Sequence, residues 1–499
     1  MTSASPPRHR HRRLVFAACL LATFTAAIEA TIVATSMPSI VAEVGGFKFY
    51  AWVFSIYVLT QVVSAPIYGR LADTWGRKPV LISGLVLFLA GSLASGFATS
   101  MPMLIAFRFF QGFGAGAIQP VSMTLVGDLY ALEERASIQG YISSVWGLSA
   151  VVGPIGGGLI VATLGWSWIF WLSIPFGLAA LVLVALYHQE NLPHARLRID
   201  LPGAALIFIA LSCLIVALTM GGDLGYAATG GLLAAALVVF RVLLWHARRA
   251  AHPIIDLALW AKPFIARGNL ASLVAGIVMI GPISFLPAYV QGVLERSVMV
   301  GGFVIAGMPV AWMMGSIISS RIYARTGARR LSRIAGVSML IGTVVIALGV
   351  PYSPYFGTLG MAFVGVAMGY LTTAYLFGIQ SSLAWSERGS ATASMMLMRM
   401  LGNAIGAALF GGILNHSLQN FLDAHPDTLD GRSVPMESVR NLLAGHGVVD
   451  QSAAVLATLR GGLDHSLQLV FWAVAAAGLV GLFTAWRVPE VAPAKPAAG

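Results

Sequence analysis

The chain has 499 residues, of which 58% are hydrophobic and only 10% are charged. A chain this apolar must be solvated by lipid, which excludes a soluble protein of two or three domains. The net charge of +11 would elsewhere suggest nucleic acid, but the Lys and Arg residues fall mostly in short segments between apolar runs, where they set membrane topology. We therefore expect the lipid bilayer, and no nucleic acid, as a partner.

Fourteen apolar runs are long enough to cross a hydrocarbon core of about 30 Å, which takes about 20 helical residues. They lie near 14–38, 51–69, 79–98, 102–123, 140–161, 168–188, 201–221, 225–246, 264–290, 299–319, 332–350, 356–379, 391–414 and 466–486. This pattern predicts an all-α polytopic membrane protein. We expect residues 1–190 to form a six-helix bundle, 191–263 an inserted helix pair with its linker, and 264–499 a second six-helix bundle.

The cations indicate the orientation, because Lys and Arg favour cytoplasmic loops. With the N-terminus inside, 23 of the 30 Lys and Arg residues lie in inner segments and 5 in outer ones. The remaining two, Arg108 and Arg399, lie within membrane runs. We therefore expect a multi-pass protein with both termini in the cytoplasm.

A polar loop at 68–79, Y-G-R-L-A-D-T-W-G-R-K-P, separates the second and third runs. Its glycines permit a tight crossover, its acid can cap a helix or pair with a nearby Arg, and its cations anchor the inner face. We expect it to act as a conformational latch. The candidate residues are Gly69, Asp73, Gly76, Arg77 and Lys78.

An internal repeat relates this loop to residues 320–329. Aligning Gly76 with Gly327 gives an offset of 251 residues, which also carries the start of the first run onto that of the ninth. The second copy has Ala324 where the first has Asp73. We therefore expect a one-sided latch, in which Asp73 matters and Ala324 matters little.

Two opposite charges lie at similar depths in the first and fourth runs. At about 1.5 Å per residue, Glu29 lies about 24 Å and Arg108 about 20 Å above the inner surface, so the two could meet. A desolvated carboxylate can bind a proton near neutral pH, and a neighbouring cation can tune or release it. These residues are candidates for proton coupling. The alternative is a fixed structural ion pair.

The fifth run carries Ser149, Gly153 and Gly157 at spacings of four, a stripe of small residues that lets another helix approach closely. Pro154 removes a backbone donor and permits a bend. The candidates for a functional motif here are Gly147, Gly153, Pro154 and Gly157. A plain helix-packing face would show the same pattern.

Polar or amphipathic residues inside the runs are candidates for lining a substrate cavity. Among them Arg399 could be a counter-ion to a substrate, although a buried structural charge fits as well. The full set is Thr31, Gln111, Tyr289, Tyr375 and Arg399.

Residues 415–465 form the one long polar segment, which the orientation places outside. Its first part reads as a loop, while Met436 to Leu463 has apolar residues at helical spacing and could form an external hairpin. A flexible linker is the alternative. The segment could contact a periplasmic partner.

No metal or nucleotide chemistry is indicated. Cys19 and Cys213 lie inside apolar runs, and no G-x-x-x-x-G-K-[ST], H-E-x-x-H or C-x-x-C pattern occurs. We expect no cofactor, no metal site and no enzymatic activity.

Several of these patterns resemble motifs of the major facilitator superfamily. The loop G-x-L-A-D-x-x-G-R-K resembles the family's signature between helices two and three, and R-x-x-Q-G-x-G-x-G from Arg108 resembles its fourth-helix motif, associated with proton coupling. The fifth-run string G-x(5)-G-P-x-x-G-G resembles a motif found chiefly in exporters.

Other stretches resemble the fourteen-helix drug:proton antiporter branch of that family. Residues 29–38 are similar to its D-x-T-x-V-N-x-A-L-P motif, with Glu29 in place of Asp. Residues 166–177 resemble W-R-W-I-F-x-x-N-x-P-x-G, but Ser167 replaces Arg and Ser173 replaces Asn, which weakens a polar role there. Residues 399–406 resemble the branch's R-x-x-G-x-A-I-G.

The resemblance covers essentially the whole chain and implies the major facilitator fold. It also implies proton-coupled export of small amphipathic compounds, including drugs, across the bacterial inner membrane. A dedicated exporter of one metabolite or lipid would share every motif. A non-transporting sensor or scaffold is disfavoured, because it has no reason to bear the cost of Glu29 and Arg108 in a membrane.

Overall fold

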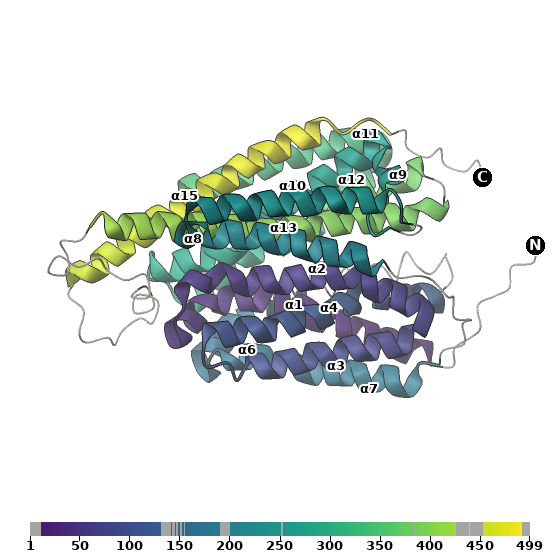
Figure 1. Cartoon of the computed structure of the whole chain (residues 1–499), viewed down its shortest axis with the longest axis horizontal. Helices are drawn as coiled ribbons and strands as arrows, with labels where there is room; N and C mark the ends of the chain where they lie inside the picture. The colour runs from purple at the N-terminus through teal and green to yellow at the C-terminus, as the bar shows by residue number, and fades with distance from the viewer. Residues whose placement is uncertain are drawn as a thin grey trace, which may run out of the picture. The chain divides into compact units, whose positions relative to one another are not determined.

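The computed structural model describes residues 11–130, 141, 145, 148–149, 152–153, 155–189, 200–250, 253–383, 385–425, 439 and 453–491, and these residues contain helices and no strand. In chain order the elements are α1 (Arg12–Val44), η1 (Phe47–Phe49), α2 (Tyr50–Trp75), α3 (Arg77–Ser95), α4 (Met101–Leu129), an apolar helix at Ile155–Leu164, α6 (Ser167–Trp171), α7 (Ser173–Tyr187), α8 (Leu201–Ala247), α9 (Leu257–Trp260), α10 (Pro263–Gly292), α11 (Val298–Gly349), α12 (Pro354–Ser382), α13 (Trp385–Asp423) and α15 (Ala453–Trp486) (Figure 1).

Thirteen helices among the described residues are long and apolar enough to cross a membrane. The expected fifth span is described in part, as the shorter apolar helix Ile155–Leu164. Two of the long helices, α8 and α11, each contain two spans joined at one glycine. The predicted all-α polytopic membrane fold is confirmed.

The contacts divide the chain into two compact units. Unit 1 comprises Met1–Ser36, Ile56–Ser212 and Leu237–Ile254, and unit 2 comprises Met37–Ser55, Cys213–Ala236 and Ile255–Gly499. The expected division of the chain at 190 and 263 stays a prediction.

Unit 1 is held by close packing of α3 against α4, which small residues allow. A Cβ on Gly91 would lie 2.7 Å from the Gln111 backbone, and one on Gly84 would collide with Ala117. Around this contact Leu85, Phe88 and other apolar side chains are buried in one cluster. Because dispersion falls steeply with distance, such close backbone approach is an effective way to hold helices together in lipid.

The expected polar loop at 68–79 is wrong as a loop, because almost all of it is helical. α2 continues to Trp75 and α3 begins at Arg77, so Gly76 alone leaves the helical conformation, with φ 98° and ψ 156°. A positive φ is readily accessible only to glycine. One residue therefore turns the chain, and the polar side chains lie on the adjoining helix ends.

The aligned glycine of the second copy makes the same kind of turn. Gly327 has φ 69° and ψ 171° inside α11, in the first turn of the span Arg325–Gly349, which follows the span Val298–Tyr323. The shared backbone geometry supports the alignment of Gly76 with Gly327 that the repeat predicted.

The inserted pair in α8 turns at Gly225, which has φ 79°. At its base the Asp200 carboxylate accepts hydrogen bonds from Gly203 N (2.9 Å) and Ile254 N (3.2 Å), and pairs with His246 Nε2 at 2.6 Å. One acid thus fixes the start of α8, its end and the linker that follows.

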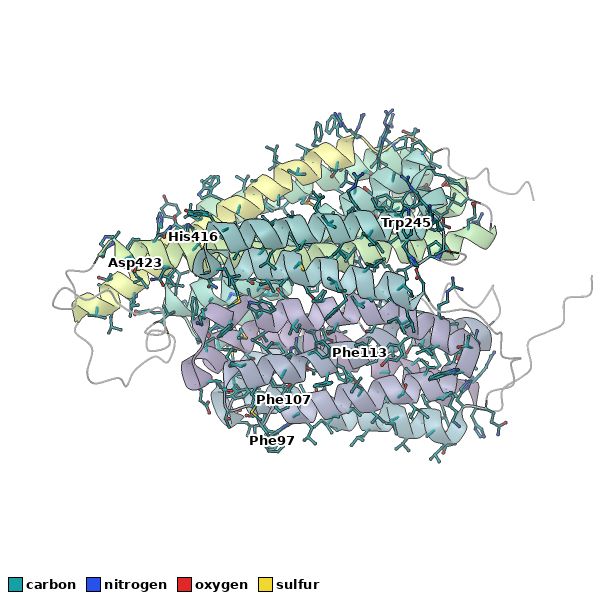
Figure 2. The ribbon with its side chains drawn as sticks, viewed as in Figure 1. Phe97, Phe107, Phe113, Trp245, His416 and Asp423 are labelled. Atoms are coloured by element: carbon teal, nitrogen blue, oxygen red, sulfur yellow. The ribbon has the colours of Figure 1, made fainter. Side chains whose placement is uncertain are left out.

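The loop expected in the first part of 415–465 is wrong up to Asp423, whereas the helix expected in its last part is present from Ala453. α13 runs on to Asp423 and α15 begins at Ala453, so both helices extend beyond the runs at 391–414 and 466–486. His416 and Asp423 lie on this extension of α13 (Figure 2). The helical spacing is confirmed for 453–463, while 426–438 and 440–452 lie outside the described residues, so the hairpin stays a prediction.

Apolar packing explains why the helices continue. Leu418 and Leu422 of α13 and Leu459 and Leu463 of α15 are each 0% exposed. Close by, Ser466 Oγ donates to Ser417 Oγ at 3.2 Å. Hydropathy averaged over a window ended the runs too early, because a helix stays ordered wherever one face is buried.

Candidate functional site

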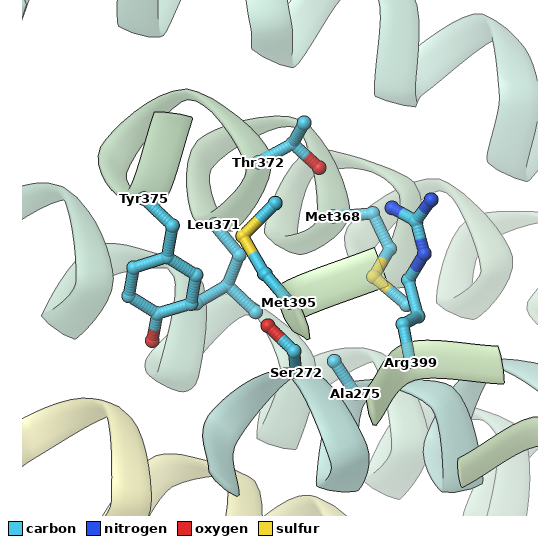
Figure 3. Close-up of a pocket in the computed structure, with 8 residues that line it drawn as sticks. All are labelled: Ser272, Ala275, Met368, Leu371, Thr372, Tyr375, Met395 and Arg399. Atoms are coloured by element: carbon cyan, nitrogen blue, oxygen red, sulfur yellow. The ribbon is translucent and has the colours of Figure 1, made fainter. Parts of the chain in front are cut away.

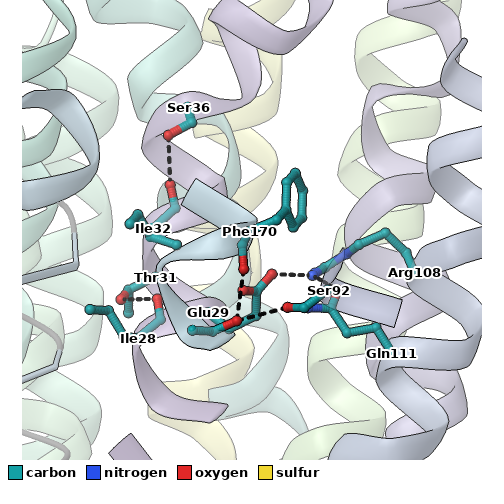
Figure 4. A network of polar contacts seen from close by, with 10 residues as sticks. Ile28, Glu29, Thr31, Ile32, Ser36, Ser92, Arg108, Gln111 and Phe170 are labelled. Carbon is teal, nitrogen blue, oxygen red and sulfur yellow. Dashed lines mark hydrogen bonds and ion pairs between the residues drawn. The ribbon is translucent and has the colours of Figure 1, made fainter. Parts of the chain in front are cut away.

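The two charges predicted to meet inside the membrane do so in unit 1. Arg108 Nη1 of α4 donates to Glu29 Oε1 of α1 at 2.6 Å (Figure 4). The Arg108 and Glu29 side chains are 2% and 0% exposed, respectively. The prediction that the two residues meet is confirmed. Their role in proton coupling stays a prediction.

A chain of buried polar side chains continues from this pair. Arg108 Nη1 also donates to Gln111 Oε1 at 2.8 Å, and Gln111 Nε2 donates to Ser92 Oγ of α3 at 2.7 Å. Ser92 Oγ lies 2.8 Å from Ser173 Oγ of α7, which donates to the Phe170 carbonyl at 2.8 Å. The network therefore connects α1, α4, α3 and α7.

Aromatic rings cover the guanidinium of Arg108. Its Cζ lies 4.0 Å from the centroid of the Tyr57 ring on α2 and 6.0 Å from that of the Phe170 ring on α6. Ring faces attract cations, most strongly where water is excluded. Arg108 is therefore held in one place by a carboxylate, an amide and two rings.

One oxygen of Glu29 has no such partner. Oε1 accepts from Arg108, whereas the buried Oε2 makes no hydrogen bond to any protein group in the described part of the chain. Burial disfavours the charged form of a carboxylate and a nearby cation favours it. Burial and Arg108 therefore act in opposite directions on the ionisation of Glu29. Its Oε2 is an oxygen that can carry a proton.

Sequence reasoning missed Ser92, Ser173, Tyr57 and Phe170. Ser173 was expected to have little polar role because it replaces Asn of the antiporter stretch, yet it is 1% exposed and ends the network. The signal that could have found it was present: Phe170 and Ser173 both lie in the stretch 166–177 that resembles the antiporters.

The glycines after Arg108 fix the position of α4. A Cβ on Gly112 would collide with the Tyr57 carbonyl of α2, and one on Gly114 with the backbone of Phe88 on α3. Alternate glycines thus pack α4 against its two neighbours. Both contacts lie within two turns of Arg108, so they hold its backbone rigidly.

The fifth-run stripe packs against α1 next to Glu29. A Cβ on Gly153 would collide with Thr31 Oγ1, and one on Gly157 would lie 2.6 Å from Ile32 Cγ1. Thr31 Oγ1 itself donates to the Ile28 carbonyl at 3.0 Å and contacts the Ser149 carbonyl at 3.3 Å. Gly147 and Pro154 lie outside the described residues.

The expected latch residues lie at the junction of α2 and α3. Gly69 and Asp73 belong to the last turns of α2, and Gly76 forms the turn. Lys78 Nζ donates to the carbonyls of Ala185 (2.7 Å) and His188 (2.8 Å), at the C-terminal end of α7. The lysine therefore satisfies carbonyls that a helix end leaves without partners. Latching itself stays a prediction.

Lys78→Met is expected to destabilise unit 1, because it leaves the end of α7 without its cationic donor. Hydrogen bonds from a charged group contribute about 1.5–3 kcal/mol to the free energy of unfolding. Thermal unfolding in detergent measures the change. Lys48→Met is the matched control, since Lys48 is exposed and lies over the Phe49 ring. Equal shifts in melting temperature for both variants would contradict this role for Lys78.

The second copy has an acid from elsewhere in the chain. Ala324 replaces Asp73 there, but the Glu490 carboxylate lies against the Cα of Gly327, where a Cβ would collide with Oε1. Residues from Ala328 onward continue α11, and a carboxylate near the start of a helical segment is electrostatically favourable. Residues 320–329 therefore lack an acid, as expected, but Glu490 brings a carboxylate next to them from the C-terminal part of the chain.

Two of the cavity candidates, Tyr375 and Arg399, line one small cleft in unit 2 (Figure 3). The cleft lies between α10, α12 and α13, and its empty space is about 280 Å³ only when the part open to solvent is included. Within the described residues Arg399 forms no ion pair or hydrogen bond, and its Cζ lies 5.5 Å from the Trp312 ring centroid. A cation–π contact contributes about 0.5–2 kcal/mol, whereas an intramembrane Arg costs about 2.5 kcal/mol or more.

The other three candidates have different neighbours. Gln111 is 0% exposed in the polar network of unit 1, and Thr31 packs against the fifth span. Tyr289 is 1% exposed and donates to Asp464 Oδ1 of α15 at 2.6 Å. Asp464 was missed because it precedes the expected last run at 466. None of the described His, Cys, Asp and Glu side chains form a group of three that could hold a metal ion.

Comparisons with known proteins show the family to which the chain belongs. Residues 19–407 match the Major Facilitator Superfamily. The chain is 31% identical to the multidrug transporter protein MdtP of Bacillus subtilis over 428 residues, which cover 85% of this chain and 79% of that one. It is also 31% identical to multidrug resistance protein 3 of the same organism, over 82% and 81% of the two chains.

Solved structures share the fold at low sequence identity. A bacterial homolog of the human lysosomal transporter Spinster, inward-facing and unoccupied, superposes with a TM-score of 0.67 at 17% identity, covering 96% of this chain and 98% of that one. The D-xylose-proton symporter gives a TM-score of 0.63 at 13% identity, over 96% and 98%. With the family match over most of the sequence, these likenesses place the chain in the Major Facilitator Superfamily of membrane transporters.

Proposed function

We propose that this transporter exports amphipathic organic compounds in exchange for protons. The observation that carries the proposal is the buried Glu29–Arg108 pair, with one carboxylate oxygen that no described protein group engages. A fixed charge pair in the middle of a membrane protein is costly, so its presence favours a functional role. The multidrug relatives from Bacillus subtilis support the substrate class.

In the proposed cycle, Glu29 takes up a proton from the outer side and releases it inside. Protonation of Glu29 removes the negative charge that Arg108 faces. The contacts of Arg108 with Gln111 and the Tyr57 ring then provide a larger share of the interactions that hold it. The buried network transmits that change to α3 and α7. Rocking of the halves then exposes the substrate site on the other side.

We further propose that the protein resides in the bacterial inner membrane with both termini in the cytoplasm. The excess of Lys and Arg in the expected inner segments supports this orientation. In it, the Gly76 turn and Lys78 lie on the cytoplasmic side, where a latch would control access from the cell interior.

Reconstitution tests the proposal directly. Purified protein in liposomes is given an imposed pH gradient and dansyl-labelled amphipaths of positive, zero and negative charge. The expected result is transport against the proton flow that stops when the gradient is collapsed with nigericin. Transport that proceeds equally with and without the gradient would contradict proton exchange. Transport of one probe alone would favour the dedicated exporter over the multidrug pump.

A further inference from the structure

Among the described residues, Arg399 of α13 is the one charged side chain that lines the cleft of Figure 3. The hydroxyl residues Ser272 and Thr372 and the phenol of Tyr375 also line it, and the remaining walls are apolar. Figure 3 shows Arg399 and Tyr375 at opposite ends of the cleft, with Met368, Leu371 and Met395 between them. A site of this composition fits a molecule with an apolar body and one charged end.

Six acids described in unit 2 lie against groups other than Arg399, among them Asp423, which accepts from Gln419 at 2.9 Å, and Glu490, which lies against Gly327. Glu387 accepts from Lys262 at 2.7 Å, and Glu295 pairs with Arg460. Asp464 accepts from Tyr289 and Gln468. Asp256 caps α9 through Ala258 N. The positive charge of Arg399 is therefore left without a carboxylate partner by the described side chains of this unit.

The backbone of Arg399 is held close to α10. A Cβ on Gly276 would collide with the Arg399 carbonyl, and one on Gly402 with the Leu273 carbonyl, so α10 and α13 are in backbone contact at Arg399 and in the turn that follows it. The position from which the guanidinium extends is therefore fixed. A partly buried cation on a fixed backbone position can discriminate between charged and neutral ligands.

From this cleft we infer the substrate class: amphipathic organic anions, whose carboxylate or equivalent acidic group pairs with Arg399 while their apolar body lies against the methionines and Leu371. The inference deepens the proposed export function and rests on it. It predicts that cationic amphipaths are poor ligands of this cleft, because the like charge of Arg399 repels them.

Binding to purified protein in nanodiscs tests this inference without transport. The probes are dansylglycine, which carries a carboxylate, its neutral methyl ester, and a dansyl quaternary ammonium of similar size. Energy transfer from tryptophan reports binding, since Trp312 lies beside Arg399. We expect dansylglycine to bind about tenfold or more tightly than the ester, and the cation to bind weakest.

Variants of Arg399 separate charge recognition from packing. Arg399→Gln should lower dansylglycine affinity about ten- to a hundredfold and leave ester affinity unchanged, with Arg399→Lys intermediate. Arg399→Gln should also raise the melting temperature, because it removes a partly buried charge without a carboxylate partner. Arg267→Gln is the control, since Arg267 of α10 donates to the Arg487 carbonyl at an exposed position and should not alter binding.

Several outcomes would overturn the inference. They are equal affinity of the wild type for dansylglycine and its ester, an equal loss of both in Arg399→Gln, or tightest binding of the cation. Charge-selective binding without transport driven by a pH gradient would contradict the proposed function and leave this inference standing. Transport driven by the gradient without any charge preference would contradict this inference alone.

Discussion

Glu29→Gln is expected to abolish transport driven by a pH gradient, lowering it to the level of protein-free liposomes. The amide keeps an oxygen that can accept from Arg108 at the same position, so the contact now measured at 2.6 Å can persist. It cannot take up and release a proton in the physiological range. Exchange of labelled for unlabelled substrate, which needs no net proton movement, should remain.

Folding must be measured alongside transport, because the substitution leaves Arg108 buried opposite a neutral group. Removing one partner of a buried ion pair costs about 3–5 kcal/mol, and the retained hydrogen bond should reduce that cost. Size-exclusion profiles and thermal unfolding monitor it. Glu43→Gln is the matched control, since Glu43 lies exposed on the same helix, and its transport should equal that of the wild type.

A double variant separates proton coupling from a fixed structural pair. Glu29→Gln with Arg108→Gln removes both charges and leaves a neutral, hydrogen-bonding network around Gln111 and Ser92. If the pair is only structural, removing both charges should restore the transport that Glu29→Gln loses. If Glu29 carries the proton, the double variant should be stable and still inactive with a pH gradient. If the single variant Glu29→Gln keeps transport driven by the pH gradient, Glu29 is not the coupling acid.

Features that depend on helical rise alone could be predicted from the sequence. The contact of Glu29 with Arg108 follows from counting residues from the membrane surface, because every helix rises by about 1.5 Å per residue. The turn at Gly76 and its counterpart at Gly327 follow from glycine's access to positive φ.

Features that depend on helix rotation or tertiary packing could not be predicted. Whether Ser92 faces Gln111 and Ser173 depends on the rotation of α3 and α7 about their axes, which a serine in an apolar run does not reveal. Asp464 was placed in the polar segment before the last run, because the start of α15 is set by burial against α13, not by hydropathy. For the same reason, the pairing of Tyr289 with Asp464 could not be foreseen.

Gly153 is the position where a single methyl group should have the largest effect on α1. A Cβ there would collide with Thr31 Oγ1, two residues beyond Glu29. Overpacking a tight contact costs about 1–3 kcal/mol, which is about ten- to a hundredfold in rate if it falls on one state of the cycle. We therefore expect Gly153→Ala to reduce transport by that factor, and Gly153→Leu to abolish it.

Gly156 provides a matched control on the same helix. A Cβ on Gly156 meets only Val152 Cγ1, at 3.9 Å, which is ordinary contact. Gly156→Ala should therefore keep full transport and stabilise the helix by about 0.5–1 kcal/mol, because alanine loses less backbone entropy than glycine. Transport rates in liposomes and melting temperatures measure the two effects separately.

Removing the colliding atom should rescue the defect. Thr31→Ala deletes Oγ1, so Gly153→Ala combined with Thr31→Ala should recover most of the transport that Gly153→Ala loses. Such a rescue would show that Gly153 allows α1 to pack closely against the fifth helix. This packing in turn positions Glu29. If Gly153→Ala and Gly156→Ala behave alike, or if Thr31→Ala gives no recovery, close packing against α1 is not what this stripe provides. The glycines would then have to act through the bend or flexibility of their own helix.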